Sequence, residues 1–384
     1  MRVAIIGDYP LNVARIQGGV QAAFAYLVKG LARIEDLQIH LVTMTGPRLA
    51  GQTQTRPDGV YLHYLPFFPR FEFARNYRTY QTHLNSVLAQ IQPDVVHAQE
   101  ATTHAYVALR SGYPAAVTMH GIRREDIKYG VSLGVRVRNW LHNRLIEQYN
   151  LKQMRYLIAI SRYVTDYFST QLRPDVRVYY VPNAIDENFF TLPQSSVGHT
   201  LLYAGRVIAR KRTLDLVHAF ARIASRCPEA QLRIAGEYRS EASYAEAIQR
   251  YIQSNGLSDR VHLLGPLAEE AVLSEFARCD ILVLPSAQET TPMVIAQAMA
   301  ASKPVVATPV GGVTEMVRHD ETGLLVEVGN VECLAQALLR LLEDSSLRTK
   351  LGQAGYQFAL ENYHINTVAR RTVQVYQQIA DLPK

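Results

Sequence analysis

Glu289 opens a stretch, "ETTPMVIAQAM", in which an acidic and an amide side chain are spaced for binding chemistry. The run before it, "DILVLPS", has the composition of a buried strand, and the run after it is helix-like. Pro292 suits the first position of that helix, because its missing N–H would be unpaired there. Thr290 or Thr291 would then cap the helix. Gln297, the next polar side chain, would lie one to two turns in.

The start of this helix predicts an anion site. Its free backbone N–H groups, around Met293 and Val294, and the positive end of its dipole suit a phosphate. A carboxylate at Glu289 is unfavourable beside phosphate unless it binds hydroxyl groups, and sugars supply hydroxyl groups. Gln297 would reach the same side. A surface glutamate and an ordinary helical glutamine remain the alternative interpretation.

A basic loop supports the phosphate interpretation. In "YAGRVIARKR", Arg206 directly follows a strand-like run and Lys211 comes five residues later, flanked by Arg210 and Arg212. Cations that converge at the end of a strand match a diphosphate. Taken alone, such a loop is more often a solvated surface.

Two further features fall in the N-terminal half. Gly18 and Gly19 stand directly before a helix-like run, where they allow the close backbone approach that a phosphate or a sugar ring requires. "AVTMHG" ends a strand-like run with His120 and Gly121. We expect His120 at the edge of a binding site, although a single histidine is often structural.

Several familiar catalytic motifs are missing. The sequence contains no H-E-x-x-H, no G-x-S-x-G and no G-x-x-x-x-G-K-[ST] motif. We therefore expect no metal site and no cofactor, and phosphate binding by Arg, Lys and backbone N–H groups.

The elements around these residues follow a repeated βαβ rhythm. Strand-like runs in the first half are "VAIIG", "IHLVTM", "VVHA", "AAVTMHG" and "YLIAIS"; those in the second are "TLLYAG", "LRIAGE", "VHLLG", "ILVLPS", "PVVAT" and "GLLVEV". Continuous apolar strands indicate parallel sheets covered on both faces. The two series meet in a Pro-, Asn- and Ser-containing segment at residues 181–200. The sequence thus predicts two doubly wound α/β domains, 1–185 and 186–363, and a C-terminal helix within 364–384 that packs on either of them.

Composition limits the class of protein. The 384 residues are 48% apolar and 19% charged, which is typical of globular domains. The sequence opens on "MRVAIIG" without a signal-peptide pattern, and its three cysteines lack metal-ligand spacing. We therefore expect a cytoplasmic protein.

Charge divides unevenly between the halves. Residues 1–190 carry 21 Lys and Arg against 14 Asp and Glu, a net charge of +7, whereas residues 191–384 carry 19 against 20, a net charge of −1. The basic half is expected to face something anionic: nucleic acid, a lipid surface or a phosphorylated substrate. Residues 64–80 and 123–145 interleave aromatic side chains with arginines, which suits a membrane interface or a sugar. Nucleic acid ranks lower because no motif for it is present.

The motifs "GGV", "TMHG", "VPNAID", "YAGR" with its lysine, "LPSAQE" and "AMAASKPVVATPVGGVTEMV" together resemble the family 4 retaining glycosyltransferases. The resemblance runs from Gly18 to about Tyr363 and implies the GT-B fold, two Rossmann-like domains facing across a cleft. It also implies metal-independent transfer of a sugar from a nucleotide diphosphate sugar to a polysaccharide, glycolipid or other hydroxyl acceptor, with retention of configuration. An enzyme with lipid-linked acceptors would work peripherally at the inner membrane face.

The resemblance also assigns roles. Arg206 and Lys211 would hold the diphosphate and stabilise the leaving group, Glu289 would bind the hydroxyls of the donor sugar, and His120 would contact that sugar. The remaining donor-binding positions would be Gly18, Gly19, Gly265, Pro266, Leu267, Thr290, Thr291, Pro292, Met293, Val294 and Gln297.

One position departs from the family pattern. The family places a second glutamate where this chain has Gln297, and that glutamate binds the ribose hydroxyls. A neutral amide in its place should cost on the order of 1 kcal/mol of donor affinity. The departure leaves open a catalytically weak homologue that serves as a partner or regulatory subunit. A sugar-nucleotide epimerase of the same fold is a separate alternative, for which the sequence shows no suitable pair of carboxylates.

Overall fold

The structure is a computed structural model. It describes residues 1–10, 16, 18–67, 72–122, 125, 140, 143–193 and 199–382.

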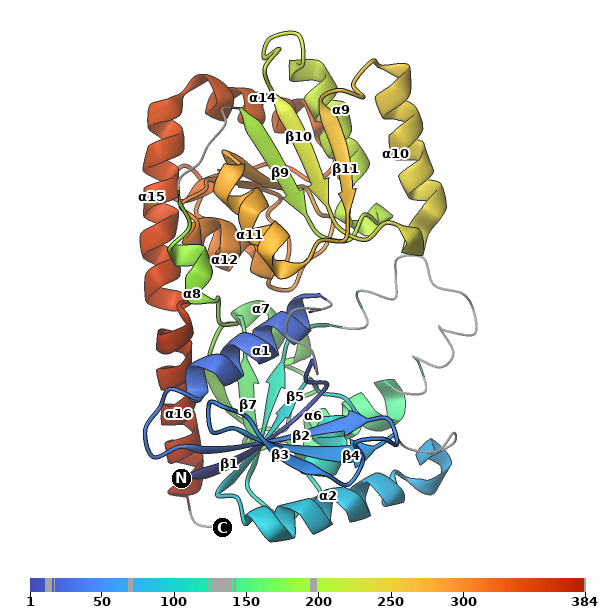
Figure 1. Cartoon of the computed structure of the whole chain (residues 1–384), viewed down its shortest axis with the longest axis vertical. Helices are drawn as coiled ribbons and strands as arrows, with labels where there is room; N and C mark the ends of the chain where they lie inside the picture. The colour runs from blue at the N-terminus through green and yellow to red at the C-terminus, as the bar shows by residue number, and fades with distance from the viewer. Residues whose placement is uncertain are drawn as a thin grey trace. The chain divides into compact units, whose positions relative to one another are not determined.

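The chain forms two compact units (Figure 1). The first comprises Met1–Leu11, Val20–Ala184 and Ile365–Lys384, and the second comprises Asn12–Gly19 and Ile185–His364. The chain passes to the second unit after Ala184 and returns to the first after His364.

The first unit is built on an eight-stranded sheet. Its strands are ordered β3-β4-β2-β1-β5-β6-β7-β8, and all neighbouring strands pair in parallel except β3 and β4, which are antiparallel. The strands are β1 (Arg2–Ile6), β2 (Gln38–Thr45), β3 (Thr53–Thr55), β4 (Tyr61–Pro66), β5 (Val95–Gln99), β6 (Ala115–Met119), β7 (Tyr156–Ala159) and β8 (Arg177–Tyr180).

Helices connect the strands of the first unit. They are α1 (Gly19–Leu31), α2 (Arg78–Ile91), α3 (Thr103–Ala108), α6 (Gln148–Gln153), α7 (Arg162–Phe168) and α16 (Ile365–Ala380), with short turns η2 (Glu72–Arg75) and η3 (Asn143–Glu147). The central strands β5 and β6 are buried along their whole length, as expected for a sheet covered on both faces.

The C-terminal helix α16 belongs to the first unit. Its buried side chains recur at helical spacing, from Ile365 and Val368 to Tyr376 and Ile379. Gly30 of α1 lets the two helices approach closely, since a Cβ atom there would lie 2.8 Å from the carbonyl oxygen of Ile365.

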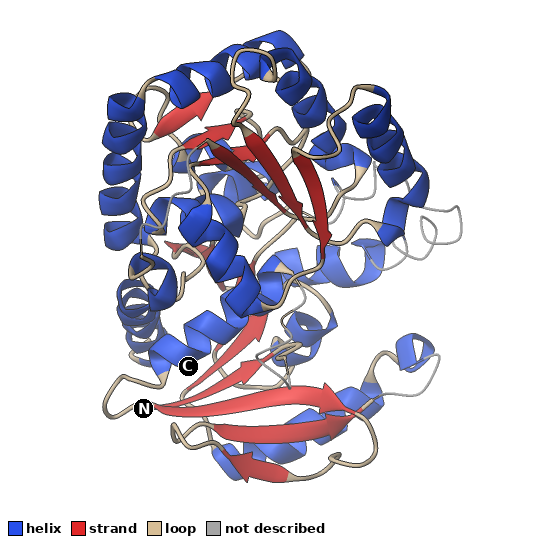
Figure 2. Cartoon of the chain, turned by 45° about the horizontal axis from the view of Figure 1, so that its top comes forward, coloured by secondary structure: helices blue, strands red, loops and turns tan. Residues whose placement is uncertain are grey.

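The second unit contains a six-stranded parallel sheet with helices on both sides (Figure 2). Its strand order is β11-β10-β9-β12-β13-β14. The strands are β9 (Thr200–Ala204), β10 (Gln231–Ala235), β11 (Val261–Gly265), β12 (Ile281–Leu284), β13 (Val305–Ala307) and β14 (Gly323–Leu325). The helices are α8 (Glu187–Phe190), α9 (Thr213–Ile223), α10 (Ala242–Ser254), α11 (Glu269–Arg278), α12 (Met293–Ala300), α13 (Val313–Met316), α14 (Val331–Glu343) and α15 (Ser345–Asn362), with turns η4 (Ala209–Lys211) and η5 (Arg239–Glu241).

Both sheets are doubly wound, as predicted. The strand order reverses between β1 and β5 in the first sheet and between β9 and β12 in the second. In such sheets, ligands bind beyond the carboxyl ends of the strands at this reversal. The loops after β9 and β12 are therefore where a site in the second unit should lie.

The eleven strand-like runs of the sequence all correspond to strands, whereas β3, β4 and β8 were not predicted. β3 is exposed throughout, and β8 at the sheet edge has exposed ends, so neither shows a continuous apolar run. Among the described helices, none has the length and apolar character that crossing a membrane requires.

Candidate functional site

A lysine–glutamate ion pair lies at the reversal point of the second sheet. Lys211 ends the η4 turn after β9, and its Nζ donates a hydrogen bond to Oε1 of Glu289, which follows β12. Both side chains are nearly enclosed, at 14% and 7% exposure. Ser286 donates to the same carboxylate oxygen at 2.6 Å. Within the described chain, Glu289 Oε2 has no partner, so one carboxylate oxygen is available to a ligand hydroxyl.

Hydrogen bonds of Arg210 link the two loops that carry this pair. Its Nη1 donates to the backbone oxygen of Gln288 at 2.6 Å and to the side-chain oxygen of that residue at 2.9 Å. The backbone N–H of Ala287 donates back to the Arg210 carbonyl oxygen at 2.8 Å. Arg210 is buried, so its charge holds these two loops together, unlike that of the exposed Arg206 in the same basic loop. Its partner Gln288 lies 78 residues away in the sequence, where no local pattern indicates it.

Arg206 and Arg212 have different surroundings. Arg212 Nε donates to Asp215 at 2.6 Å, which commits its charge to a neighbour on α9. Arg206 is exposed, and among the described residues its guanidinium makes no ion pair. The pKa of Glu237 is lowered, chiefly by a hydrogen bond from Ser240 and to a smaller extent by the positive charge of Arg206. Arg206 is therefore a cation near the carboxyl edge that is available to an anionic ligand.

Three glycines bring the loops after β9, β10 and β11 together. The Gly236 N–H donates to the Gly265 carbonyl oxygen at 2.8 Å. A Cβ atom on Gly236 would lie only 1.9 Å from the carbonyl oxygen of Gly205, so only glycine fits there. Gly265 has a φ of 71°, and a Cβ atom added to it would lie 3.7 Å from the ring of Tyr238. The predicted "GPL" segment thus lies on the same edge, with Pro266 exposed and Leu267 half-buried.

The helix after β12 begins one residue later than predicted. Pro292 is the N-cap residue in extended conformation, and α12 starts at Met293 without a side-chain cap. The predicted cap by Thr290 or Thr291 is wrong: the Thr290 carbonyl oxygen accepts from Gly312 N–H, and the buried Thr291 hydroxyl has no partner among the described residues. In the described structure the N–H groups of Met293 and Val294 are also unbonded, as expected at a helix start.

Gln297 lies on the second turn of α12 and is half-buried. Its side-chain amide makes no hydrogen bond to any described residue. Both amide atoms are thus available to a ligand.

His120 lies at the carboxyl end of β6 in the first unit and is buried. Its Nδ1 lies 2.8 Å from Asn183 Oδ1, and its Nε2 lies 2.7 Å from Gln99 Oε1. Burial lowers the pKa of His120 to about 4, partly offset by the Asn183 hydrogen bond. The ring is neutral near pH 7 and held from both sides.

The glycine pair lies at the start of α1. Gly18 has a φ of 87°, which favours glycine, and Gly19 is the first residue of the helix. Both are exposed. Residues 11–15 and 17 of the same predicted loop lie outside the described residues.

Sequence reasoning missed two parts of the site. Ser286 follows β12 directly and carried the weak signal of a hydroxyl at a strand end. Glu237 follows β10 and orders its own loop by accepting bonds from Ser240 N–H and its hydroxyl at 2.9 and 2.8 Å.

Side chains that could bind a metal do not cluster in the described structure. In the described part of the chain, no three His, Cys, Asp or Glu side chains are placed to hold a metal ion. The three cysteines are unpaired, and Cys227 and Cys279 are buried.

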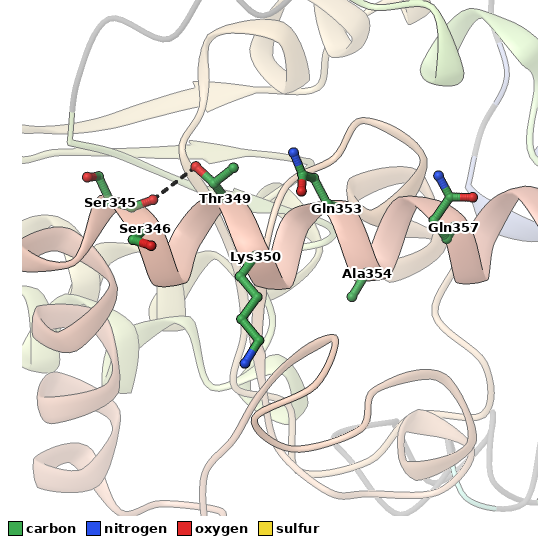
Figure 3. Close-up of a pocket in the computed structure, with 7 residues that line it drawn as sticks. All are labelled: Ser345, Ser346, Thr349, Lys350, Gln353, Ala354 and Gln357. Atoms are coloured by element: carbon green, nitrogen blue, oxygen red, sulfur yellow. Dashed lines mark hydrogen bonds between the residues drawn. The ribbon is translucent and has the colours of Figure 1, made fainter.

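A separate hollow of about 840 Å³ runs along α15 (Figure 3). Every side chain that lines it comes from this one helix: Ser345, Ser346, Thr349, Lys350, Gln353, Ala354 and Gln357. Among the described residues no second element lines the hollow, so it is a surface feature and no part of the site above.

Comparison with known proteins agrees with this arrangement. "Glycosyltransferase Family 4" matches residues 17–189, and "Glycosyl transferases group 1" matches residues 185–358. An exopolysaccharide phosphotransferase of Streptomyces coelicolor is 36% identical over 184 residues, which cover 47% of this chain and 19% of that protein. This chain thus spans about a fifth of that relative.

Other similarities extend over the whole chain. An uncharacterized glycosyltransferase of Methanocaldococcus jannaschii is 24% identical over 370 residues, 95% of each chain. The crystal structure of Anabaena HepE in complex with UDP has a TM-score of 0.75 and 18% identity, and the match covers 98% of this chain and 100% of that one. The two family descriptions match successive halves of the chain, and the solved structures similar to it have the GT-B fold. The chain therefore belongs to the family 4 glycosyltransferases of the GT-B fold and is a transferase.

Proposed function

We propose that the protein is a retaining, metal-independent glycosyltransferase that uses a nucleotide diphosphate sugar. The observation that carries the proposal is the Lys211–Glu289 pair at the reversal point of the second sheet, beside the start of α12. It combines a cation for phosphate with a carboxylate whose second oxygen is available for hydroxyls. The Anabaena structure of similar fold holds UDP, which supports a nucleotide as the donor's leaving group.

The roles follow from charge and available donors. Transfer breaks the bond between the anomeric carbon and a phosphate oxygen and forms a bond to an acceptor hydroxyl, so negative charge develops on the departing diphosphate. Arg206, Lys211 and the N–H groups of Met293 and Val294 would stabilise that charge. The Lys211 ammonium has three N–H groups, and Glu289 uses one of them, which leaves two for phosphate oxygens.

Glu289 would then bind the donor sugar. Its Oε1 is occupied by Lys211 and Ser286, which fix the carboxylate, and its Oε2 would accept from sugar hydroxyls. Gln297 would hold the ribose, and the loop from Gly265 to Leu267 would cradle the base. Gly18 and Gly19, at the start of α1, would approach the phosphates or transferred sugar, and His120 of the first unit would contact that sugar.

The acceptor is proposed to be a glycan or lipid-linked hydroxyl compound near an anionic membrane surface. Described parts of the two aromatic and basic stretches expose Phe67, Phe73, Trp140 and Leu145. The Arg144 guanidinium lies 5.5 Å from the Trp140 ring centroid. Exposed aromatics beside arginines suit a headgroup layer. Residues 68–71 and most of 123–142 within those stretches lie outside the described residues.

A thermal-shift and turnover screen tests the proposal. The protein is incubated with UDP-, GDP-, ADP- and dTDP-sugars in EDTA, and melting temperature and nucleoside diphosphate release are measured. A ligand that binds only the folded state raises the melting temperature. We expect a selective shift with slow release, and an anomeric proton in any product with the donor's configuration by NMR. No shift across the panel, or an inverted product, would contradict the proposal.

A further inference from the structure

A buried hydrogen-bonded chain runs behind His120 in the first unit. The hydroxyl of Tyr376 lies 2.6 Å from His97 Nδ1, and His97 Nε2 lies 2.6 Å from the Thr118 hydroxyl. The Gln99 amide bridges the two histidines, with its nitrogen 3.2 Å from His97 Nε2 and its oxygen 2.7 Å from His120 Nε2. Each of these side chains is buried, so water cannot substitute for a missing partner.

The far end of this chain comes from the C-terminal helix. Tyr376 lies on α16, 279 residues after His97 on β5 (Figure 1). Its ring meets the His97 ring edge-on, with 5.5 Å between centroids and 68° between planes. The hydroxyl and the ring contact thus place a side chain of α16 against His97 of the first sheet.

The protons available on these side chains allow two arrangements of the hydrogen bonds between them. Both nitrogens of His120 face amide oxygens, Gln99 Oε1 and Asn183 Oδ1, yet a neutral ring has a single N–H to donate. Burial keeps the ring neutral by lowering its pKa to about 4. One of the two amides must therefore present its NH₂ group, which a half-turn of that amide achieves without changing its shape.

The two arrangements differ in the direction of donation along the hydrogen bonds between Tyr376 and His120. If Asn183 turns, His120 carries its proton on Nε2, Gln99 donates to His97, and His97 donates to Tyr376. If Gln99 turns, Tyr376 donates to His97 Nδ1, Gln99 donates to His120 Nε2, and His120 carries its proton on Nδ1.

Tyr376 decides between them. Among the described residues, His97 is the single partner of its hydroxyl, and the side chain is 0% exposed. In the first arrangement its proton would be buried without an acceptor, which is costly. Moving the His97 proton to Nε2 would free Nδ1 for Tyr376, but it would set two donors, that N–H and the Gln99 amide, 3.2 Å apart and leave the amide only a 3.5 Å contact with Nδ1. The second arrangement leaves the Thr118 hydroxyl proton without an acceptor instead. That costs less, because an alkyl hydroxyl is a weaker donor than a phenol. The hydrogen-bonded chain therefore runs from Tyr376 towards His120.

We propose that Tyr376, acting through His97 and Gln99, is a positioning residue that fixes the proton of His120 on Nδ1. The proposal rests on the proposed function only in so far as His120 contacts the transferred sugar. The C-terminal helix, which would otherwise serve packing alone, then sets the state of a side chain in the site.

Tyr376→Phe tests this, with Tyr80→Phe as the matched control. Tyr80 is also buried in the first unit, and its hydroxyl also lies 2.6 Å from a histidine Nδ1, that of His104. His104 contacts Asp8 and not His120. Both variants remove one buried hydroxyl and keep the ring.

Turnover with the donor found by the screen is the first readout. We expect Tyr376→Phe to lower kcat about tenfold with the donor KM unchanged, the loss expected from one misplaced hydrogen bond. Tyr80→Phe should melt at a similarly lowered temperature and keep its kcat. In a His120→Gln background, Tyr376→Phe should have no further effect, because coupled residues are non-additive.

The ¹⁵N resonances of the histidine rings give a readout that needs no activity. The His120 signals, identified by their loss in His120→Gln, should show Nδ1 protonated in the parent and a mixture of tautomers in Tyr376→Phe. An unchanged tautomer in Tyr376→Phe, or equal kcat losses with and without His120, would overturn the proposal. A parent that turns over no donor would contradict the proposed function instead, and the tautomer measurement would still decide this one.

Discussion

Removing Lys211 should destabilise the second unit, because it leaves Glu289 enclosed without its counter-ion. We choose Lys211→Met, which keeps most of the side-chain volume. Both side chains of the pair are almost fully buried, at 14% and 7% exposure. Removing one partner of a buried ion pair costs about 3–5 kcal/mol. Here Ser286 still donates to Oε1, and Oε2 has no partner among the described residues to lose, so we expect the low end of that range.

The lost free energy of unfolding can be measured as a lower melting temperature. For a unit that spans Ile185–His364, each kcal/mol shifts Tm by roughly 2–4 °C, so a loss of about 3 kcal/mol should lower Tm by about 6–12 °C. Scanning calorimetry measures this. Lys350→Met is the control, because Lys350 is an exposed lysine of the same unit without an ion pair to any described residue.

A double variant separates stability from function. Lys211→Met with Glu289→Gln removes both charges and leaves an amide that still accepts from Ser286, so at least half of the lost stability should return. Donor turnover should stay lost. The reasoning is refuted if Lys211→Met melts within 1 °C of the parent, or if the double variant melts lower than Lys211→Met.

Other outcomes follow from the same site and its scaffold. Arg206→Ala should lower turnover by several orders of magnitude without changing Tm, since the side chain is exposed; an active variant would refute the phosphate assignment. Gln297→Glu should keep activity or tighten donor binding about fivefold, by titration calorimetry, because a charged acceptor is stronger; abolished binding would refute this. Gly236→Ala should abolish soluble expression, because its Cβ would meet the Gly205 carbonyl oxygen at 1.9 Å, whereas Gly256→Ala, with nothing within 4 Å, should cost only about 1 kcal/mol. The pKa of His120 is about 4 in the folded protein against 6.5 for an ordinary histidine, so its contribution to stability is complete above pH 6.5 and is lost as pH falls towards 4. By pH 5 the free energy of unfolding should have fallen by about 2 kcal/mol through this residue. Urea unfolding measures it, and a His120→Gln variant whose midpoint shifts as much between pH 7 and pH 5 as that of the parent would contradict this.

Much of the architecture was predictable because buried parallel strands have a strong signature. Strands such as β12, apolar at every position, can only lie inside a sheet covered on both faces. The edge strands β3 and β8 of the first sheet escaped prediction for the opposite reason, as β8 shows with its half-exposed "RVYY". The start of α12 was predicted to within one residue, since Pro292 marks it strongly.

Side-chain partnerships were not predictable, because they join positions far apart in the sequence. Lys211 and Glu289 were each assigned to a ligand, yet they bind each other across 78 residues. Arg210 looked like its neighbours Lys211 and Arg212, and only the folded loop shows it turned inward to Gln288. The sequence identified the groups capable of chemistry, and the fold determines which of them reach one another.

The central claim is that Arg206, Lys211 and the start of α12 form a diphosphate site. Titration calorimetry tests it most directly, with the nucleoside diphosphate identified by the screen and with the parent and Arg206→Ala proteins. Loss of a charged hydrogen bond is worth about 1.5–3 kcal/mol, so Kd should rise about 10- to 100-fold in the variant. Equal affinities in the two proteins would contradict the account.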